Sequence, residues 1–134
     1  MVRVNLEAPL IISQILLRDL KKNLGFIINI SSITAKESSP HGCAYGSTKA
    51  ALTHFSNSLF DENRKYGVKV ISIHPDMTKS NFYRNADFKE GDIKESYINP
   101  KEIAKVLETI LNQREGMVVT DITLRPQKHK IVKK

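Results

Sequence analysis

The residues best suited to chemistry in this sequence are Tyr45 and Lys49, which stand four positions apart. Side chains at that spacing share one face of a helix. A free tyrosine has a pKa near ~10 and is a poor base at neutral pH, but a close ammonium group lowers that pKa by ~1–3 units. A phenol tuned in this way can donate a proton to a carbonyl oxygen or accept one from an alcohol. Ser32, which follows a short apolar run, is placed to hydrogen-bond the same oxygen.

Taken alone, Tyr-x-x-x-Lys is a weak motif, because any surface helix can carry it. The alternative is a tyrosine packed on the core beside a solvated lysine. The surrounding sequence makes the motif more specific. An apolar run over 26–30 ends in Ser31 and Ser32, a polar loop continues to Gly42, and a segment rich in small residues follows.

Hydrophobic periodicity and helix-capping residues divide the chain into alternating helices and strands. The predicted helices span 2–23, 45–66 and 100–113, and the predicted strands span 26–30, 68–73 and 117–123. Uninterrupted apolar strands that alternate with amphipathic helices are typical of a parallel sheet with right-handed crossovers. In such sheets ligands bind at the carboxyl ends of the strands, which is where Ser32 lies.

The ends of these elements also have sequence signals. Asn23 and Gly25 mark the end of the first helix, as left-handed caps do, and Pro75 is expected to end the second strand. The polar segment 77–99 is predicted to hold a short helix near 79–85 and then irregular chain. Long polar segments of this kind are often lids or binding loops.

Size and composition indicate one soluble globular unit. The 134 residues, with 40% hydrophobic and 26% charged content, predict a single partial domain over 1–134 that ends in a basic tail over 125–134. Much of the net charge of +7 lies in that tail, which we expect to be solvated. Attraction to an anionic ligand such as a nucleotide phosphate is the alternative. Few aromatic residues alternate with these charges, which argues against binding to single-stranded nucleic acid.

Several other classes are disfavoured by the sequence. No apolar run is long enough to span a bilayer, and residues 1–20 lack a signal-peptide pattern. The single Cys43 fits a reducing, cytoplasmic setting. The four histidines lack metal-ligand spacing, so no metal site is predicted. No Gly-x-Ser-x-Gly elbow of a hydrolase is present.

The strand, loop and Tyr-x-x-x-Lys-Ala-Ala segment together resemble the short-chain dehydrogenase/reductase family. The family's catalytic serine lies thirteen residues before its tyrosine, which is Ser32 here, and its asparagine lies 27 residues before that serine, which is Asn5 in Val-Asn-Leu. The resemblance implies that Tyr45 is the general acid/base and that Ser32 orients the substrate oxygen. It also implies that Lys49 lowers the tyrosine pKa and holds the nicotinamide ribose, and that Asn5 supports a water relay.

The same resemblance implies NAD or NADP as cofactor. Pro75, Thr78 and Ser80 match the family's segment that contacts the nicotinamide carboxamide, although Asp76 replaces a glycine there. The implied fold is α/β, the C-terminal part of a Rossmann-like doubly wound parallel sheet. The family's glycine-rich nucleotide loop has no counterpart among the six glycines. We therefore expect about 100 further residues before Met1, at ~30 per βα unit.

The function implied by the resemblance is hydride transfer between NAD(P) and a small carbonyl or alcohol substrate. We expect this chain to be inactive alone, because the nucleotide-binding part is missing. The first two helices, 2–23 and 45–66, correspond to the family's dimer interface and predict a homo-oligomer, unless their apolar faces simply cover the sheet. The alternative function is a non-catalytic half-domain that dimerises. A basic tail that binds nucleic acid is a third hypothesis, which steep salt dependence would reveal.

Overall fold

The computed structural model describes all residues from 1 to 134, and the chain divides into two compact units. The first unit contains residues 1–74 and 119–122, and the second contains residues 75–118 and 123–134. Each unit is described by itself below. The single partial domain that the sequence suggests over 1–134 stays a prediction.

The first unit begins with a π-helical turn and alternates helices with strands, as the sequence predicts. Its elements are η1 (Arg3–Glu7), α1 (Ala8–Asn23), β1 (Phe26–Ile30), η2 (Ile33–Ala35), α2 (Cys43–Asn63), η3 (Arg64–Tyr66) and β2 (Lys69–Pro75). The helices predicted over 2–23 and 45–66 are therefore present. The second of them begins two residues earlier than predicted and closes with the 3₁₀ turn η3.

β1 and β2 pair in parallel, with a register from Phe26 opposite Lys69 to Ile30 opposite Ile73. The sheet has the order β1-β2-β4, where β4 is Asp121–Leu124. The predicted parallel α/β arrangement is confirmed. The prediction that the second strand stops at residue 73 is wrong, because β2 continues to Pro75. A proline is tolerated as the last strand residue when no partner requires its missing N–H.

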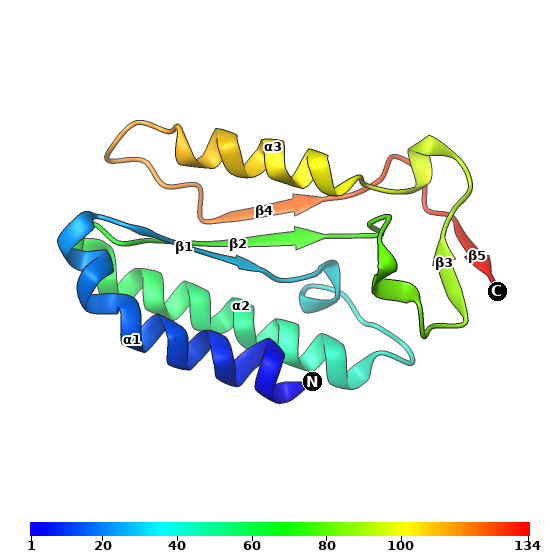
Figure 1. The fold of residues 1–134 in the computed structure, drawn as a ribbon, viewed down its shortest axis with the longest axis horizontal. Helices are drawn as coiled ribbons and strands as arrows, with labels where there is room; N and C mark the ends of the chain where they lie inside the picture. Colours follow the sequence, from blue (N-terminus) through cyan, green and yellow to red (C-terminus); the bar gives the residue numbers. More distant parts are fainter. The chain divides into compact units, whose positions relative to one another are not determined.

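α1 and α2 lie on the same side of β1 and β2 (Figure 1). The core between them is a cluster of buried apolar side chains from α2, from β2 and from the residue directly before β2, with further apolar residues packed against it. The cluster consists of Leu59, Val68 and Val70, joined by Leu20, Ile27, Phe55 and Phe60. Burial of these side chains supplies the main favourable free energy of this unit. It also explains the apolar periodicity of both helices.

The end of α1 differs in one detail from the prediction. The left-handed residue is Leu24, with φ 52°, rather than Asn23 or Gly25. The amide of Gly25 donates to the Leu20 carbonyl at 2.8 Å. A Cβ on Gly25 would lie 2.6 Å from Leu20 Cδ2, so a larger residue there would require the Leu20 side chain to shift.

Two polar contacts fix α2 against β1. Asn29 Nδ2 donates to Ser56 Oγ at 2.8 Å, and the hydroxyls of Ser31 and Thr53 are 2.8 Å apart. Ser31 and Ser56 are buried. Because buried polar groups need hydrogen-bond partners, these pairs set the rotation of α2 relative to the strand and therefore the direction in which its other faces point.

The second unit contains shorter elements. They are η4 (Asn81–Tyr83), β3 (Phe88–Glu90), η5 (Lys94–Ser96), α3 (Pro100–Leu111) and β5 (Ile131–Lys133). The helix predicted over 100–113 is confirmed, and Glu102 accepts a hydrogen bond of 2.7 Å from the Asn99 amide at its start. The short helix predicted near 79–85 is only the 3₁₀ turn η4. The strand predicted over 117–123 is observed later, at Asp121–Leu124.

The basic tail is not simply solvated chain. β5 pairs with β3 in an antiparallel register, with Lys89 opposite Val132. Lys130 Nζ lies 2.5 Å from Asp92 Oδ1, and the Lys134 amide donates to the Asp87 carbonyl at 2.8 Å. The expectation of a solvated tail over 125–134 is therefore wrong for the backbone, part of which is hydrogen-bonded to other segments. The lysine side chains of the tail are exposed.

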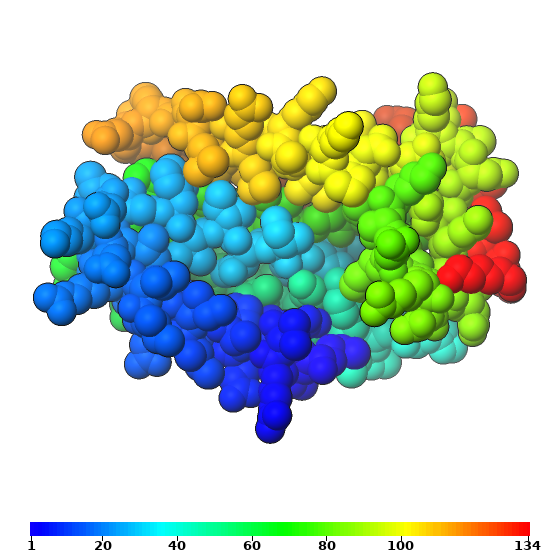
Figure 2. Space-filling model, viewed as in Figure 1, coloured from blue at the N-terminus to red at the C-terminus, as the bar shows by residue number.

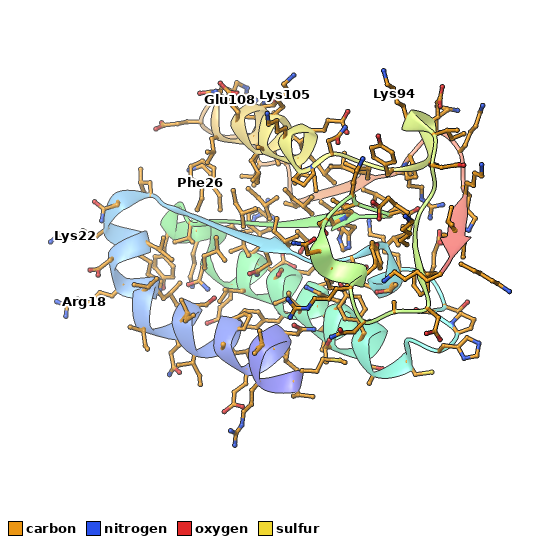
Figure 3. All side chains as sticks on the ribbon, turned by 45° about the vertical axis from the view of Figure 1, so that its right-hand side comes forward. Arg18, Lys22, Phe26, Lys94, Lys105 and Glu108 are labelled. Atoms are coloured by element: carbon orange, nitrogen blue, oxygen red, sulfur yellow. The ribbon has the colours of Figure 1, made fainter.

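α1 presents apolar side chains on the surface of the first unit. Ile15 is 70% exposed and Ile12 is 54% exposed, and α1, drawn in dark blue, forms part of the surface in the space-filling view (Figure 2). Arg18 and Lys22 project outward from the same helix (Figure 3). None of the helices is both long enough and apolar enough to cross a membrane.

Candidate active site

The first turns of α2 carry Tyr45 and Lys49, and the Lys49 Nζ atom lies 5.7 Å from the centroid of the Tyr45 ring. α2 begins after Gly42 at the end of the loop that leaves β1. Both side chains are partly buried. The helix therefore brings a phenol and an ammonium group close together near the carboxyl end of β1.

Ser32 lies in the loop directly after β1 and is buried. Its hydroxyl is hydrogen-bonded to the side chain of Tyr45. It also accepts hydrogen bonds from the Thr34 amide at 3.2 Å and the Thr34 hydroxyl at 3.0 Å. Because a hydroxyl oxygen has two lone pairs, these two bonds leave its proton directed at another acceptor. Ser32 is thus arranged as a donor toward Tyr45.

The pKa of Tyr45 lies above its ordinary value because burial disfavours the charged phenolate, and the hydrogen bond from Ser32 opposes this rise. The sequence-based expectation that Lys49 brings the tyrosine pKa down is therefore not met here. Desolvation of a neutral acid raises its pKa, and in this structure desolvation outweighs the lowering. Tyr45 holds its proton at neutral pH.

Lys49 is tied to the strand that precedes it. Its Nζ donates a hydrogen bond of 2.8 Å to the carbonyl oxygen of Ile30. Burial lowers the pKa of Lys49 because the charged ammonium loses solvation. One of its three N–H donors is used in this bond, which leaves two for other acceptors.

Asn5 lies within the π-helical turn η1. Its Nδ2 donates to Thr48 Oγ1 at 3.2 Å, and Thr48 Oγ1 donates to the Tyr45 carbonyl at 2.7 Å. π-helical turns often occur at functional sites. Asn5 is therefore connected to the turn of α2 that carries Tyr45 and Lys49, so all four predicted catalytic residues lie in the first unit.

The three remaining predicted residues belong to the second unit and are described within it. Thr78 Oγ1 donates to the carbonyl of Asp76 at 2.9 Å, and Ser80 Oγ accepts from the Phe82 amide at 3.2 Å. Pro75 ends β2. Asp76, which stands in place of a glycine, has no positive φ, and its carboxylate accepts from the Met77 amide at 2.8 Å.

An open depression of about 330 Å³ lies between the loop after β1 and the outer side of α2. Its lining residues are Thr34, Ala35, Lys36, Glu37, Ser38, Ser39, Gly42, Cys43, Gly46, Ser47 and Ala50. Ser32, Tyr45 and Lys49 do not line it. We therefore base the candidate site on the hydrogen-bonded side chains and not on this depression.

Four residues that the sequence did not mark as site residues contact the site directly or through one partner. Thr34 and Thr48 bind Ser32 and Asn5 as described, and His74 and Asp121 form a further pair at the carboxyl end of β2. A histidine at the end of an apolar strand, directly before Pro75, was the available signal for His74. Nothing local marks Asp121, because it is 47 residues away from its partner.

A family model described as short chain dehydrogenase matches residues 1–91, more than half of the chain. The chain therefore belongs to the short-chain dehydrogenase family. An uncharacterized oxidoreductase of Staphylococcus epidermidis is 33% identical over 127 residues, which are 94% of this chain and 54% of that protein. An uncharacterized oxidoreductase of Staphylococcus aureus is 34% identical over 127 residues, which are 94% of this chain and 53% of that protein.

Solved structures show the same fold. An alcohol dehydrogenase from the archaeon Thermococcus sibiricus, complexed with 5-hydroxy-NADP, superimposes with a TM-score of 0.84 at 26% identity, covering 97% of this chain and 54% of that chain. A serine dehydrogenase complexed with NADP+ gives a TM-score of 0.79 at 19% identity, covering 94% of this chain and 54% of that chain. The second likeness concerns the fold alone.

The chain spans about half the length of the curated relatives that it matches. The family assignment and the α/β fold therefore apply to this chain. The activity of a whole protein is a proposal. The residues with predicted chemical roles all fall within the matched region up to residue 91.

Proposed function

We propose that this chain carries the proton-transfer residues of an NAD(P)-dependent oxidoreductase that interconverts a small carbonyl compound and its alcohol. The observation that carries the proposal is the hydrogen bond between the Ser32 hydroxyl and the Tyr45 side chain. Lys49 Nζ lies 5.7 Å from the same ring. An acid and a hydroxyl donor thus meet at one phenolic oxygen with a cation near the same ring, which supports general acid catalysis.

Tyr45 gives its proton to the carbonyl oxygen in the reducing direction. Because burial raises the pKa of Tyr45, the phenol is protonated at neutral pH and ready to donate. When substrate binds, the single Ser32 proton turns from the neighbouring phenol to the same carbonyl oxygen and orients it. After transfer, the Ser32 hydroxyl and the Lys49 ammonium stabilise the phenolate that remains.

NAD or NADP would supply or accept the hydride when bound. Lys49 fits a role at the nicotinamide ribose, since two of its N–H donors remain after the bond to Ile30. Pro75, Thr78 and Ser80 would contact the carboxamide, by their resemblance to the family.

Asn5 would return a proton to the site through water. Its amide is anchored to Thr48, the neighbour of Lys49, which fixes it beside the turn that carries the cation. An amide presents both donors and an acceptor, so Asn5 can hold a water molecule between Lys49 and solvent.

The expected location is the cytoplasm, since Cys43 is a free thiol and suits a reducing compartment.

The second candidate function is a non-catalytic half-domain that associates through α1 and α2. The apolar side chains of α1 that face solvent favour self-association, and they include Leu10, Ile11, Ile12, Ile15 and Leu16. Exposed apolar patches mark interaction surfaces. We propose a homo-oligomer through residues 2–23 and 45–66 under either function.

The experiment that separates the two functions uses a longer protein. The part of the S. epidermidis relative that precedes its matched region is fused before Met1, which gives what we call the joined protein. We expect the joined protein to oxidise NADPH or NADH only when an aldehyde or ketone is present, and the 134-residue chain alone to give no turnover. Cofactor binding by the joined protein without turnover on any carbonyl compound would support the non-catalytic alternative.

A further inference from the structure

His74 is fully buried near the end of β2, and both of its ring nitrogens are hydrogen-bonded. Nδ1 lies 3.1 Å from the backbone carbonyl oxygen of Ser32, and Nε2 lies 2.8 Å from Asp121 Oδ2. The Ala35 amide donates to the same Ser32 carbonyl at 3.1 Å. The carbonyl of Ser32 is thus held by two donors from different parts of the first unit.

Both partners of the His74 ring are acceptors. A backbone carbonyl has no proton to give, and an ionised carboxylate only accepts. Partial burial would raise the pKa of Asp121, but hydrogen bonds from Lys36 and His74 outweigh it and the net pKa is below its ordinary value. Asp121 is therefore an acceptor for Nε2 of His74, as the Ser32 carbonyl is for Nδ1.

Asp121 contacts both His74 and Lys36. Its second oxygen lies 2.5 Å from Lys36 Nζ, and Lys36 follows the 3₁₀ turn η2. The short segment from Ser32 to Lys36 is therefore held at one end by His74 and at the other by Asp121. Asp121, itself partly exposed, therefore connects the buried ring of His74 to Lys36 at the surface.

We propose that His74, held by Asp121, is a positioning residue that fixes the Ser32 hydroxyl toward Tyr45. With its carbonyl held by His74 and Ala35, Ser32 cannot rotate its backbone. Thr34, in the same clamped segment, fills both lone pairs of the Ser32 oxygen. The Ser32 proton is left pointing at the phenol. His74 itself does not touch the reacting atoms.

The positioning role rests on the proposed function, but its test does not need turnover. Nitrogen-15 spectra of the 134-residue chain, labelled at histidine and recorded at pH 7, report the protons on each ring nitrogen. Single glutamine substitutions at the other histidines, His41, His54 and His129, assign the signals. We expect a protonated Nδ1 for His74, because that nitrogen faces the Ser32 carbonyl. An unprotonated Nδ1 in the folded wild-type chain would overturn the proposal.

A second measurement separates positioning from a merely structural role. In His74→Gln, we expect the Thr34 and Ala35 amides to exchange about tenfold faster or more, as one charge-assisted hydrogen bond is lost. The ring carbon bonded to the Tyr45 oxygen should shift its resonance, because that atom reports hydrogen bonding at the phenol. His54→Gln, which removes an exposed histidine from α2, is the matched control and should change neither signal.

Unchanged exchange and an unchanged Tyr45 resonance in a folded His74→Gln chain would contradict the proposal. If that variant does not fold, the same exchange measurement on Asp121→Asn tests the proposal, because asparagine keeps the size of the side chain and removes its charge. We then expect faster exchange of the Ala35 amide, and unchanged exchange would contradict the proposal. These readouts involve neither cofactor nor substrate, so failure of the proposed function leaves them unaffected.

Discussion

The Nζ atom of Lys49 donates a hydrogen bond of 2.8 Å to the carbonyl oxygen of Ile30, the last residue of β1. This bond ties the second turn of α2 to the end of the strand. A lysine side chain has high rotamer entropy when it is free, and here its ammonium is held close to the Tyr45 ring. The position of the cation is thus set by the backbone of the strand.

We expect Lys49→Met to impair turnover of the joined protein strongly. The substitution keeps an unbranched side chain but removes the cation and its bond to Ile30. Loss of a group that supports general acid catalysis lowers the rate by roughly 10²–10⁴-fold. Steady-state rates measure the effect, and Lys65→Met, at an exposed lysine near the end of α2, is the control. Wild-type rates in Lys49→Met would exclude the proposed role of the cation.

We expect Ser32→Ala to raise the pKa of Tyr45 further. The hydrogen bond from Ser32 lowers that pKa in the wild-type chain, so its removal leaves the burial effect unopposed. The measurement is the ultraviolet titration of tyrosinate, taken as the difference from the same chain carrying Tyr45→Phe. Ser47→Ala, at an exposed serine on α2, should leave the titration unchanged. A lower pKa of Tyr45 in Ser32→Ala would contradict the hydrogen-bond assignment.

We expect Asp121→Asn to reduce the acid sensitivity of the fold. The folded pKa of Asp121 is depressed, so its stabilising contribution is present above the ordinary carboxyl pKa of ~3.9. That contribution is lost as the pH falls through the folded pKa. Urea unfolding at pH 7, 4 and 3 should therefore show a smaller loss of unfolding free energy for Asp121→Asn than for wild type. Asp61→Asn, at an exposed aspartate, is the control. A loss of unfolding free energy in Asp121→Asn equal to that of wild type would argue against the ion pair.

We expect Ile15→Lys to weaken self-association without unfolding the chain. Ile15 is 70% exposed in the single chain, so a lysine there costs little in the monomer and places a charge in any interface formed by α1. Sedimentation velocity should show a smaller species for this variant than for wild type. Ile131→Lys alters an exposed isoleucine outside α1 and should leave the mass unchanged. The same mass for both variants would count against an interface through α1.

Local sequence patterns were sufficient for the larger elements. The apolar run over 26–30 and the capping sequence at Asn99 and Pro100 correspond to β1 and to the start of α3. These patterns depend only on neighbouring residues, so they can be recognised in a single sequence. The pair β3 and β5 was missed, because strands of three residues that pair across some forty positions have no local signature.

The candidate site was predictable in its residues but not in its electrostatics. The spacing of Ser32, Tyr45 and Lys49 marked the site. The direction of the Tyr45 pKa depends on burial, which tertiary packing determines and spacing does not reveal. His74 and Asp121 were missed for a related reason, since their contact exists only once β2 and β4 are adjacent in the sheet.

The most direct test of the account is turnover of the joined protein with Tyr45→Phe. The substitution removes only the phenolic oxygen, and Tyr66→Phe, at an exposed tyrosine, is the matched control. We predict that carbonyl-dependent oxidation of reduced cofactor falls by roughly 10²–10⁴-fold in Tyr45→Phe and is unchanged in Tyr66→Phe, with both variants folded. Turnover at the wild-type rate in Tyr45→Phe would contradict the central claim that this phenol transfers the proton.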